Sequence, residues 1–375
     1  MNKAISENCF HGGDIISASQ HYDIPMDQWI DLSTGINPEP YPVTDTLGDI
    51  SAQAFERLPY LQPDFLDSAG AYYFDQDYEK TDDHRRRLLA VPGSQSVIQA
   101  LPACLAKLPV ILPELGYQEH VQAWRDSDAD LAFYDALELS TAKDQIDSLI
   151  AHKSAQHLVV INPNNPSGLQ FSIQQLNIWA QNLSGGGHLI VDEAFIDTQS
   201  ENSLLVQAPI NNLVVLRSFG KFFGLAGLRL GFTFANEKLC AQLQQRIGPW
   251  SINGPAQEIA THAFQNTAWQ QQASINIVTS GKASCALFAP LFAQYAVIRS
   301  MHQPLFTSYW LEAELAAFIY RAFAMRGILL RQIDCQQTGL SILRIGSLNF
   351  KDEDAVAKVK ETIQVLIDVG LFQEK

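Results

Sequence analysis

Charged side chains are scarce in this chain, and positive ones are scarcer than negative ones. Asp, Glu, Lys and Arg make up 17% of the 375 residues, against ~25% in an ordinary soluble domain. Forty acidic and 25 basic residues give a formal net charge of −15. A chain this acidic repels a phosphodiester backbone, so nucleic acid is not an expected partner. Because 47% of the residues are hydrophobic, the composition favours large buried surfaces over disorder.

Cysteine pairs, metal-ligand clusters and apolar runs of membrane length are also missing. The five cysteines stand alone in the sequence, so we expect free thiols, no disulfide framework and no metal site. The longest apolar stretch, residues 283–298, contains Pro290 and Gln294. Neither this stretch nor the first residues match a membrane span or a signal peptide. We therefore expect a soluble, cytoplasmic protein that does not bind membranes.

Short apolar runs alternate with helical patterns through the middle of the chain. Buried strands are predicted at residues 109–112, 157–162, 188–192, 213–217 and 228–235. Helices are predicted at 94–108 and 172–183, with Ser94 and Ser172 as their N-caps. Strands that alternate with helices are typical of an α/β domain with a mostly parallel sheet.

The two ends of the chain together predict a second, smaller domain. The C-terminal third reads as a helix, strands near 327–331 and 341–345, and a closing helix, which indicates an α+β unit. The first forty residues are rich in turns and are expected to pack on this unit. The domain prediction is thus a large α/β domain at 45–260 and a small one made of 1–44 with 261–375.

Lys221 has unusual neighbours for a surface lysine. It follows a predicted strand and stands among phenylalanines and glycines, with no other charge before Arg229. Apolar surroundings disfavour the ammonium form and lower the pKa of a lysine, which makes the amine nucleophilic and suited to a Schiff base. Ser218 and Arg229 on either side could bind an anion. The segment alone favours such a nucleophilic amine and leaves an ordinary loop lysine as the alternative.

Three further segments place one polar group each at the edge of the predicted sheet. Residues 91–95 (VPGSQ) form a Gly-Ser turn at a helix start, where amides and the helix dipole favour phosphate. Asn165 stands in the turn after one strand, and Asp192 ends the next. Open α/β sheets bind ligands beyond such strand ends. Together these groups require one ligand that carries a phosphate, a carbonyl, a ring oxygen and a ring nitrogen.

This set of segments resembles the fold-type I pyridoxal-phosphate enzymes of the aspartate aminotransferase superfamily, over nearly the whole chain. The resemblance implies pyridoxal 5′-phosphate as cofactor and a homodimer. It assigns catalysis to three residues: Lys221 bonds the cofactor and moves a proton, Asp192 pairs with the ring nitrogen, and Tyr117 stacks on the ring. The cofactor-binding residues that the resemblance implies are Gly93, Ser94, Gln95, Tyr117, Asn165, Asp192, Ser218, Lys221 and Arg229.

Two positions depart from the common pattern of that superfamily. Phe195 stands where a tyrosine usually shares the ring-oxygen hydrogen bond with the asparagine, so Asn165 would hold that oxygen without it. The segment that usually carries a tyrosine for the partner subunit's cofactor phosphate reads Leu58-Pro59-Tyr60. Tyr60 could substitute for that tyrosine.

The start of the chain is similar to one branch of the superfamily, the threonine-phosphate decarboxylases of cobalamin biosynthesis. The similarity lies in a His-Gly-Gly motif at residues 11–13 and in the segment LSTGINP at 32–38. It implies decarboxylation of L-threonine O-3-phosphate to (R)-1-amino-2-propanol O-phosphate. The substrate-binding residues that it implies are His11, Gly35, Asn37, Arg331 and Arg344.

Simpler interpretations of these substrate residues stay open at this stage. His11 could be an exposed turn residue, Arg331 and Arg344 could be charges on strands, and Asn37 fits an ordinary Asn-Pro turn. A histidinol-phosphate-type aminotransferase would share the cofactor residues and both arginines. A cofactor-binding regulator and an inactive scaffold are further alternatives, and the choice of decarboxylation over transamination comes from the resemblance alone.

Overall fold

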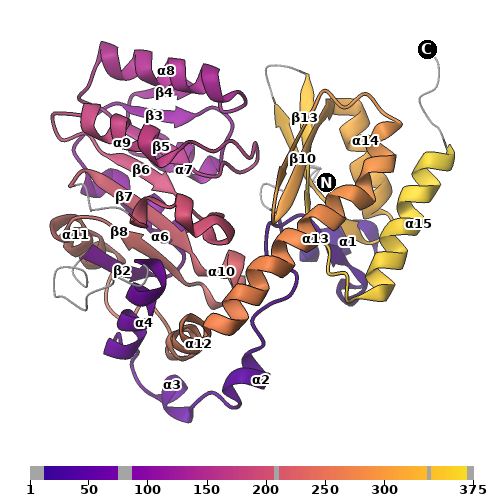
Figure 1. Ribbon diagram of the computed structural model, residues 1–375, viewed down its shortest axis with the longest axis horizontal. Helices are drawn as coiled ribbons and strands as arrows, with labels where there is room; N and C mark the ends of the chain where they lie inside the picture. Colours follow the sequence, from indigo (N-terminus) through magenta and orange to yellow (C-terminus); the bar gives the residue numbers. More distant parts are fainter. Residues whose placement is uncertain (1–11, 75–86, 207–210, 336–338, 370–375) are drawn as a thin grey trace, which may run out of the picture. The chain divides into compact units, whose positions relative to one another are not determined.

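The computed structural model describes residues 12–74, 87–206, 211–335 and 339–369, which belong to two compact units (Figure 1). The large unit comprises Pro40–Ser274, and the small unit comprises Met1–Glu39 with Ile275–Lys375. Compactness alone does not show that a unit folds or acts independently. The domain bounds at 45–260, with 1–44 and 261–375, therefore stay a prediction.

A seven-stranded sheet forms the centre of the large unit, in the order β2-β8-β7-β6-β5-β3-β4. All pairings from β7 through β4 are parallel, and β8 is antiparallel to both of its neighbours. This confirms the predicted α/β unit with a mostly parallel sheet. The strands are β2 (Leu88–Val91), β3 (Val110–Pro113), β4 (Leu131–Tyr134), β5 (His157–Ile161), β6 (Leu189–Asp192), β7 (Leu213–Ser218) and β8 (Gly231–Phe234).

Amphipathic helices join the strands and bury their apolar faces on the sheet. One core forms where Val97 and Leu101 of α6, Val121 of α7 and Leu243 of α11 pack on the sheet. The long helices are α4 (Pro63–Tyr73), α6 (Ser94–Cys104), α7 (Gln118–Asp126), α8 (Leu139–His152), α9 (Ile173–Asn182), α11 (Glu237–Ile247) and α12 (Gly254–Gln265). Shorter turns of helix are α2 (Val43–Leu47), α3 (Ala52–Glu56), η2 (Asp197–Asn202), η3 (Leu204–Val206), α10 (Phe219–Phe222) and η4 (Ala226–Leu228).

Three local predictions from the sequence were wrong in detail. The last central strand begins at Gly231 rather than at residue 228, because η4 and the left-handed Arg229 (φ 53°) precede it. Helix α6 ends at Cys104, four residues before the predicted end at residue 108. Its N-cap is Gly93 (φ 77°), and Ser94 is the first helical residue. For α9 the prediction is confirmed, since the hydroxyl of Ser172 caps the helix and accepts from the amide of Gln175.

The small unit contains a four-stranded antiparallel sheet in the order β12-β13-β10-β9. Residues 12–39 belong to the same unit, as expected, and β1 (Ile30–Asp31) pairs in parallel with β11 (Ile328–Leu329) in a separate two-stranded sheet. The remaining strands are β9 (Arg299–Gln303), β10 (Phe306–Glu312), β12 (Arg331–Cys335) and β13 (Leu340–Gly346). The helices are α1 (Ile15–Tyr22), η1 (Met26–Gln28), α14 (Ala313–Ala324) and α15 (Glu353–Val369).

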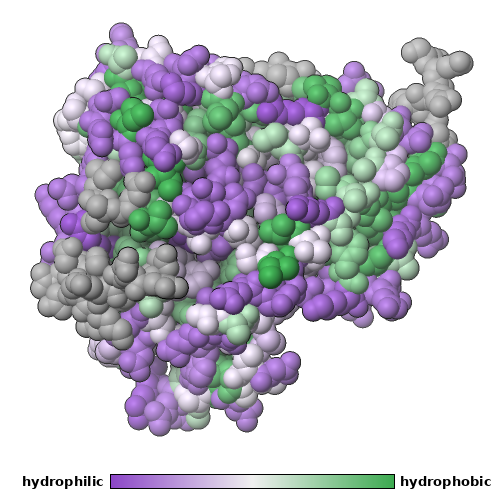
Figure 2. All heavy atoms as spheres, viewed as in Figure 1, coloured by the Kyte–Doolittle hydropathy of each residue, from purple (hydrophilic) through white to green (hydrophobic). Residues whose placement is uncertain are grey.

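Helix α13 (Thr267–Ala293) is, among the described residues, the one helix long and apolar enough to cross a membrane by length and composition. Phe288, Leu291 and Phe292 of this helix lie in the core of the small unit, against Tyr309 and Phe323. The face shown in Figure 2 carries hydrophobic residues in patches among hydrophilic ones. The C-terminal part of the helix is therefore packed into a protein core.

Candidate active site

A cavity of about 150 Å³ opens at the carboxyl ends of the parallel strands of the large unit. Ile161 at the end of β5, Asp192 at the end of β6 and Ser218 at the end of β7 all line it. Ligands of open α/β sheets bind at this edge. The lining includes every residue to which the sequence assigned a cofactor role: Gly93, Ser94, Gln95, Tyr117, Asn165, Asp192, Ser218, Lys221 and Arg229.

One corner of the cavity is built for an anion. Helix α6 begins there, and the amides of a first helical turn have no partner within their own helix. Arg229 lies so close that a β-carbon on Gly93 would stand 2.8 Å from its Nη2 atom. On the other side, a β-carbon on Gly231 would stand 2.7 Å from the backbone nitrogen of Ser94. Both glycines are therefore needed to bring the helix start and the guanidinium together, and this corner fits a phosphate group.

Asp192 is a buried carboxylate with two partners. Its Oδ1 accepts a hydrogen bond from the amide of Ala194 at 3.1 Å, and its Oδ2 lies 3.0 Å from Nε2 of His120. His120 is 1% exposed and comes from α7. The sequence analysis missed this residue, although it stands one helical turn after Tyr117, which was assigned to the site. His120 fixes the orientation of a carboxylate that would otherwise be buried with a single amide donor.

Tyr117 is joined to the anion corner by a short chain of hydrogen bonds. Its hydroxyl donates to Oε1 of Gln95 at 3.0 Å, and the Gln95 amide in turn donates to Glu119. Burial, and next the negative charge of Glu119, raise the pKa of Tyr117 to about 12. The phenol is therefore neutral at physiological pH. Glu119 is a second residue of this site that the sequence analysis did not find.

Lys221 lies in α10 and lines the cavity, as Phe195 does. Its Nζ atom is 5.4 Å from the centre of the Phe195 ring, which is within the range of a cation–π contact. A β-carbon on Gly220, the residue before Lys221, would stand 2.6 Å from Cα of Ala226. The backbone just before Lys221 therefore packs closely against the backbone at Ala226.

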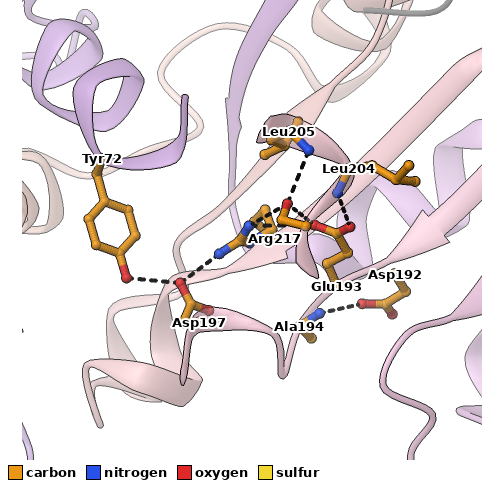
Figure 3. Close-up of polar contacts among 9 residues, drawn as sticks. Tyr72, Asp192, Glu193, Ala194, Asp197, Leu204, Leu205 and Arg217 are labelled. Atoms are coloured by element: carbon orange, nitrogen blue, oxygen red, sulfur yellow. Dashed lines mark hydrogen bonds and ion pairs between the residues drawn. The ribbon is translucent and has the colours of Figure 1, made fainter. Parts of the chain in front are cut away.

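A buried ionic cluster stands beside the cavity and was not anticipated from the sequence (Figure 3). Arg217 donates to Asp197 Oδ1 at 2.8 Å and to the hydroxyl of Ser203 at 3.1 Å, and its Nη1 lies 3.4 Å from Glu193 Oε2. The hydroxyl of Tyr72 donates to the same Asp197 oxygen at 2.9 Å. The only sequence signal was an arginine at the end of an apolar strand.

This cluster holds the carboxyl ends of β6 and β7. Two residues adjacent to it in the chain, Asp192 and Ser218, line the cavity. Arg217 precedes Ser218 in β7, and Glu193 follows Asp192 at the end of β6. Arg217 and Glu193 are 2% and 0% exposed, and buried charges require partners of this kind. Burial raises the pKa of Glu193, and the charge of Arg217 opposes that rise.

Two of the predicted substrate residues lie in the β12–β13 pair of the small unit. Arg331 and Arg344 are direct cross-strand neighbours in the antiparallel pair β12–β13. Burial, and next the positive charge of Arg331, lower the pKa of Arg344 to about 10. Arg344 is 7% exposed, so its interpretation as a surface charge is wrong.

The other predicted substrate residues fall into two groups. Gly35 and Asn37 are buried, and Oδ1 of Asn37 accepts from the amide of Glu39 at 3.0 Å, as in an Asn-Pro turn. His11 lies outside the described residues, but Gly12 is described and packs against Ser33. The two N-terminal motifs are therefore in contact, a relationship that their separation in the sequence did not reveal.

Comparison with solved structures defines the class of protein. The fold is that of the fold-type I pyridoxal-phosphate enzymes. A histidinol-phosphate aminotransferase from Sinorhizobium meliloti, solved with pyridoxal-5′-phosphate, superimposes with a TM-score of 0.73 at 16% identity over 97% of this chain and 99% of that one. An L-threonine-O-3-phosphate decarboxylase from Porphyromonas gingivalis gives 0.66 at 17% identity, over 89% and 99%.

Sequence comparison then places the chain in a particular family. It belongs to the class I and II aminotransferases, whose family model matches residues 27–283. A threonine-phosphate decarboxylase from Pseudomonas aeruginosa is 38% identical over 264 residues, which cover 70% of this chain and 72% of that protein. Enzymes of this family depend on pyridoxal phosphate, so the prediction of a pyridoxal-phosphate enzyme is confirmed.

Proposed function

We propose that this enzyme decarboxylates L-threonine O-3-phosphate to (R)-1-amino-2-propanol O-phosphate, the precursor of the cobalamin side chain. The observation that carries the proposal is the pair Arg331–Arg344, two positive charges on directly opposite strand positions. The two side chains lie on the same face of the sheet, close enough for the charge of Arg331 to lower the pKa of Arg344, so positive charge is concentrated here. A substrate with both a carboxylate and a phosphate supplies two such negative groups, and each suits an arginine fork.

The cavity of the large unit is the proposed cofactor site, with the phosphate at the start of α6. Ser94, Gln95 and Arg229 would hold that phosphate together with Gly93 and Ser218. Asn165 would hold the ring oxygen, and Tyr117 would lie on the ring face. The fit is supported by the two glycines whose missing β-carbons open this corner to an anion.

The chain's own residues divide the chemistry between them. Bound pyridoxal phosphate supplies a ring that withdraws electrons from the substrate Cα. With the cofactor in place, Asp192, oriented by His120 and the Ala194 amide, would hold a proton at the ring nitrogen. Lys221 would hold the cofactor and would deliver a proton to the substrate Cα. Phe195 keeps the surroundings of that lysine apolar.

Decarboxylation requires the substrate carboxylate to be held in one orientation while its bond to Cα breaks. We assign the orientation of the carboxylate to Arg344, and the recognition of the substrate phosphate to Arg331 with His11. Gly35 and Asn37 complete the proposed substrate residues. The LSTGINP segment and the 38% identity to a threonine-phosphate decarboxylase support this choice over transamination.

A histidinol-phosphate-type aminotransferase remains the second candidate, because structures with that activity share the fold. The two are separated by comparing kcat/KM for threonine phosphate alone with kcat/KM for histidinol phosphate plus 2-oxoglutarate. The proposed function predicts turnover of threonine phosphate without a keto acid. Turnover of histidinol phosphate with 2-oxoglutarate, and no turnover of threonine phosphate, would replace it with the aminotransferase.

We also propose that the enzyme is a cytoplasmic homodimer. The large apolar side chains that the large unit exposes include Phe55, Leu58, Tyr60 and Trp250. The rings of Tyr60 and Trp250 meet edge to face, 5.9 Å apart. Clustered apolar groups on a surface favour association. Light scattering of the purified enzyme should give twice the 41.6 kDa chain mass, and a monomeric mass at working concentration would contradict the dimer.

A further inference from the structure

Ser33 lies where three separated segments of the small unit meet. Its hydroxyl donates to Oδ1 of Asp31 at 2.6 Å and accepts from the amide of Gly13 at 2.7 Å. Its backbone carbonyl accepts a hydrogen bond from Nη2 of Arg344. Ser33 is 1% exposed, so water does not compete for these bonds. One residue thus joins the glycine pair near the chain start to the arginine of the proposed carboxylate site.

The backbone on both sides of Ser33 is held by the two neighbouring strands. The amide of Leu32 donates to the carbonyl of Leu329 at 2.8 Å, and the amide of Gly346 donates to the carbonyl of Leu32 at 2.7 Å. A β-carbon on Gly346 would stand only 2.3 Å from the carbonyl oxygen of Thr34. The peptide chain therefore passes very close to the end of β13, and little freedom remains in it.

The Ser33 carbonyl is also covered from the side of the glycine pair. A β-carbon on Gly12 would stand 2.4 Å from this oxygen, so a side chain at that position would displace it. The amide of Ser33 is engaged as well, since it donates to Oδ1 of Asp31 at 2.8 Å. Asp31 thus accepts both the amide and the hydroxyl of Ser33, which fixes the orientation of the whole residue.

We propose that Ser33, oriented by Asp31, is a positioning residue that aims Arg344 at the substrate carboxylate. A guanidinium presents its donors in a rigid plane, so fixing one Nη on a buried carbonyl fixes the direction of the remaining donors. The bond from Gly13 keeps the glycine pair against the same carbonyl. The inference rests on the proposed function of Arg344 and adds to it the residues that set its geometry.

The test compares a ligand that has the carboxylate with one that lacks it. For the holoenzyme Ser33→Ala, we expect the KM for threonine phosphate to rise about tenfold or more while kcat changes much less. The dissociation constant of the decarboxylated product, followed through the absorbance of the bound cofactor, should stay within about twofold, because it makes no contact with Arg344. The exposed Ser300 in the same unit gives the matched control, Ser300→Ala. Equal weakening for both ligands, or no weakening for either, would overturn the inference.

A second variant keeps the test decisive if Ser33→Ala folds poorly. Asp31→Asn retains an acceptor oxygen for the Ser33 bonds, and Asp31→Ala removes it. We expect the selective rise in KM to be large in Asp31→Ala and small in Asp31→Asn. Arg344→Lys separates the two levels of the proposal. If it binds threonine phosphate as the wild type does, the carboxylate role of Arg344 fails, and the role of Ser33 fails with it. If Arg344→Lys raises the KM for threonine phosphate selectively but the Ser33 and Asp31 variants do not, Arg344 keeps its carboxylate role and only the role of Ser33 fails.

Discussion

His120 and Asp192 form a fully buried pair in which Nε2 of the ring lies 3.0 Å from Oδ2 of the carboxylate. The two residues are 72 positions apart and come from α7 and from the end of β6. Asp192 is the residue that we propose for the cofactor ring nitrogen, and a buried polar group that loses a hydrogen-bond partner is left unsatisfied. The contact with His120 therefore determines whether Asp192 is oriented for its proposed role at the ring nitrogen.

Removing the imidazole should weaken the function without destroying the fold. For His120→Ala we expect a loss of about 1–3 kcal/mol in the bonding of Asp192, which corresponds to roughly 5- to 150-fold in kcat or in cofactor affinity. The measurements are kcat and the dissociation constant of pyridoxal phosphate. The exposed His152 at the end of α8 gives the control variant His152→Ala. Wild-type values for both constants in His120→Ala would show that Asp192 does not depend on His120.

Lys221 should be the residue that bonds the cofactor. Borohydride reduction of the wild-type holoenzyme should leave pyridoxal phosphate on one peptide, and Lys221→Ala should yield no such adduct by mass spectrometry. Lys238, an exposed lysine of α11, provides the control Lys238→Ala, in which the adduct should persist. An adduct retained at full yield in Lys221→Ala would assign the covalent bond to another lysine.

The cluster around Arg217 should be a stability determinant. Arg217→Met leaves the buried Glu193 and Asp197 without their cation, and breaking a buried ion pair in this way costs about 3–5 kcal/mol. Urea unfolding should show this loss in the free energy of unfolding. Arg125→Met, at an exposed position of α7, should change it by less than about 0.5 kcal/mol. Equal stability of the two variants would mean that the cluster has no net stabilising effect.

His157 should make stability depend on pH. Burial lowers its pKa from 6.5 to about 4, its Nε2 bonds the carbonyl of Ala106, and its Nδ1 accepts from the amide of His188. The unfolded state therefore binds a proton more readily than the folded state. Its contribution is fully present above pH 6.5 and is lost as the pH falls from 6.5 toward 4, by up to about 3 kcal/mol.

The measurement is the free energy of unfolding across that pH range, for the wild type and for His157→Gln. The variant replaces the titrating ring with a neutral side chain, so its curve should fall less steeply between pH 6.5 and 4. A companion variant, His188→Gln, tests the neighbouring imidazole, whose pKa burial also lowers. Parallel curves for wild type and His157→Gln would contradict the assignment.

The sequence was sufficient for the central strands β3, β5, β6, β7 and β8, the last with its start misplaced, and for the residues that meet at the cavity, but it did not reveal β4. Strand ends of a parallel sheet converge on one edge, so Asp192, Ser218 and the turn at Gly93 could be placed together before the structure was known. Glycine conformation was harder to foresee. The N-cap was assigned to Ser94, and only the positive φ of Gly93 shows that the serine amide belongs to the first helical turn.

The residues that support the site were not visible in the sequence. His120, Glu119 and Arg217 act through partners that lie far away along the chain, and pairwise spacing carries no signal for such contacts. The same holds for Ser33, whose motif was recognised but whose bonds to Gly13 and Arg344 depend on how the chain start meets β13. Local periodicity predicts elements, whereas these contacts are set by tertiary packing.

The central claim is that the enzyme removes the carboxylate of threonine phosphate. The most direct measurement supplies the purified enzyme with pyridoxal phosphate and threonine phosphate labelled with ¹³C in the carboxyl group, and no keto acid. The account predicts labelled CO₂ and aminopropanol phosphate in equal amounts. A product that retains the labelled carboxyl group, formed only when 2-oxoglutarate is added, would contradict it.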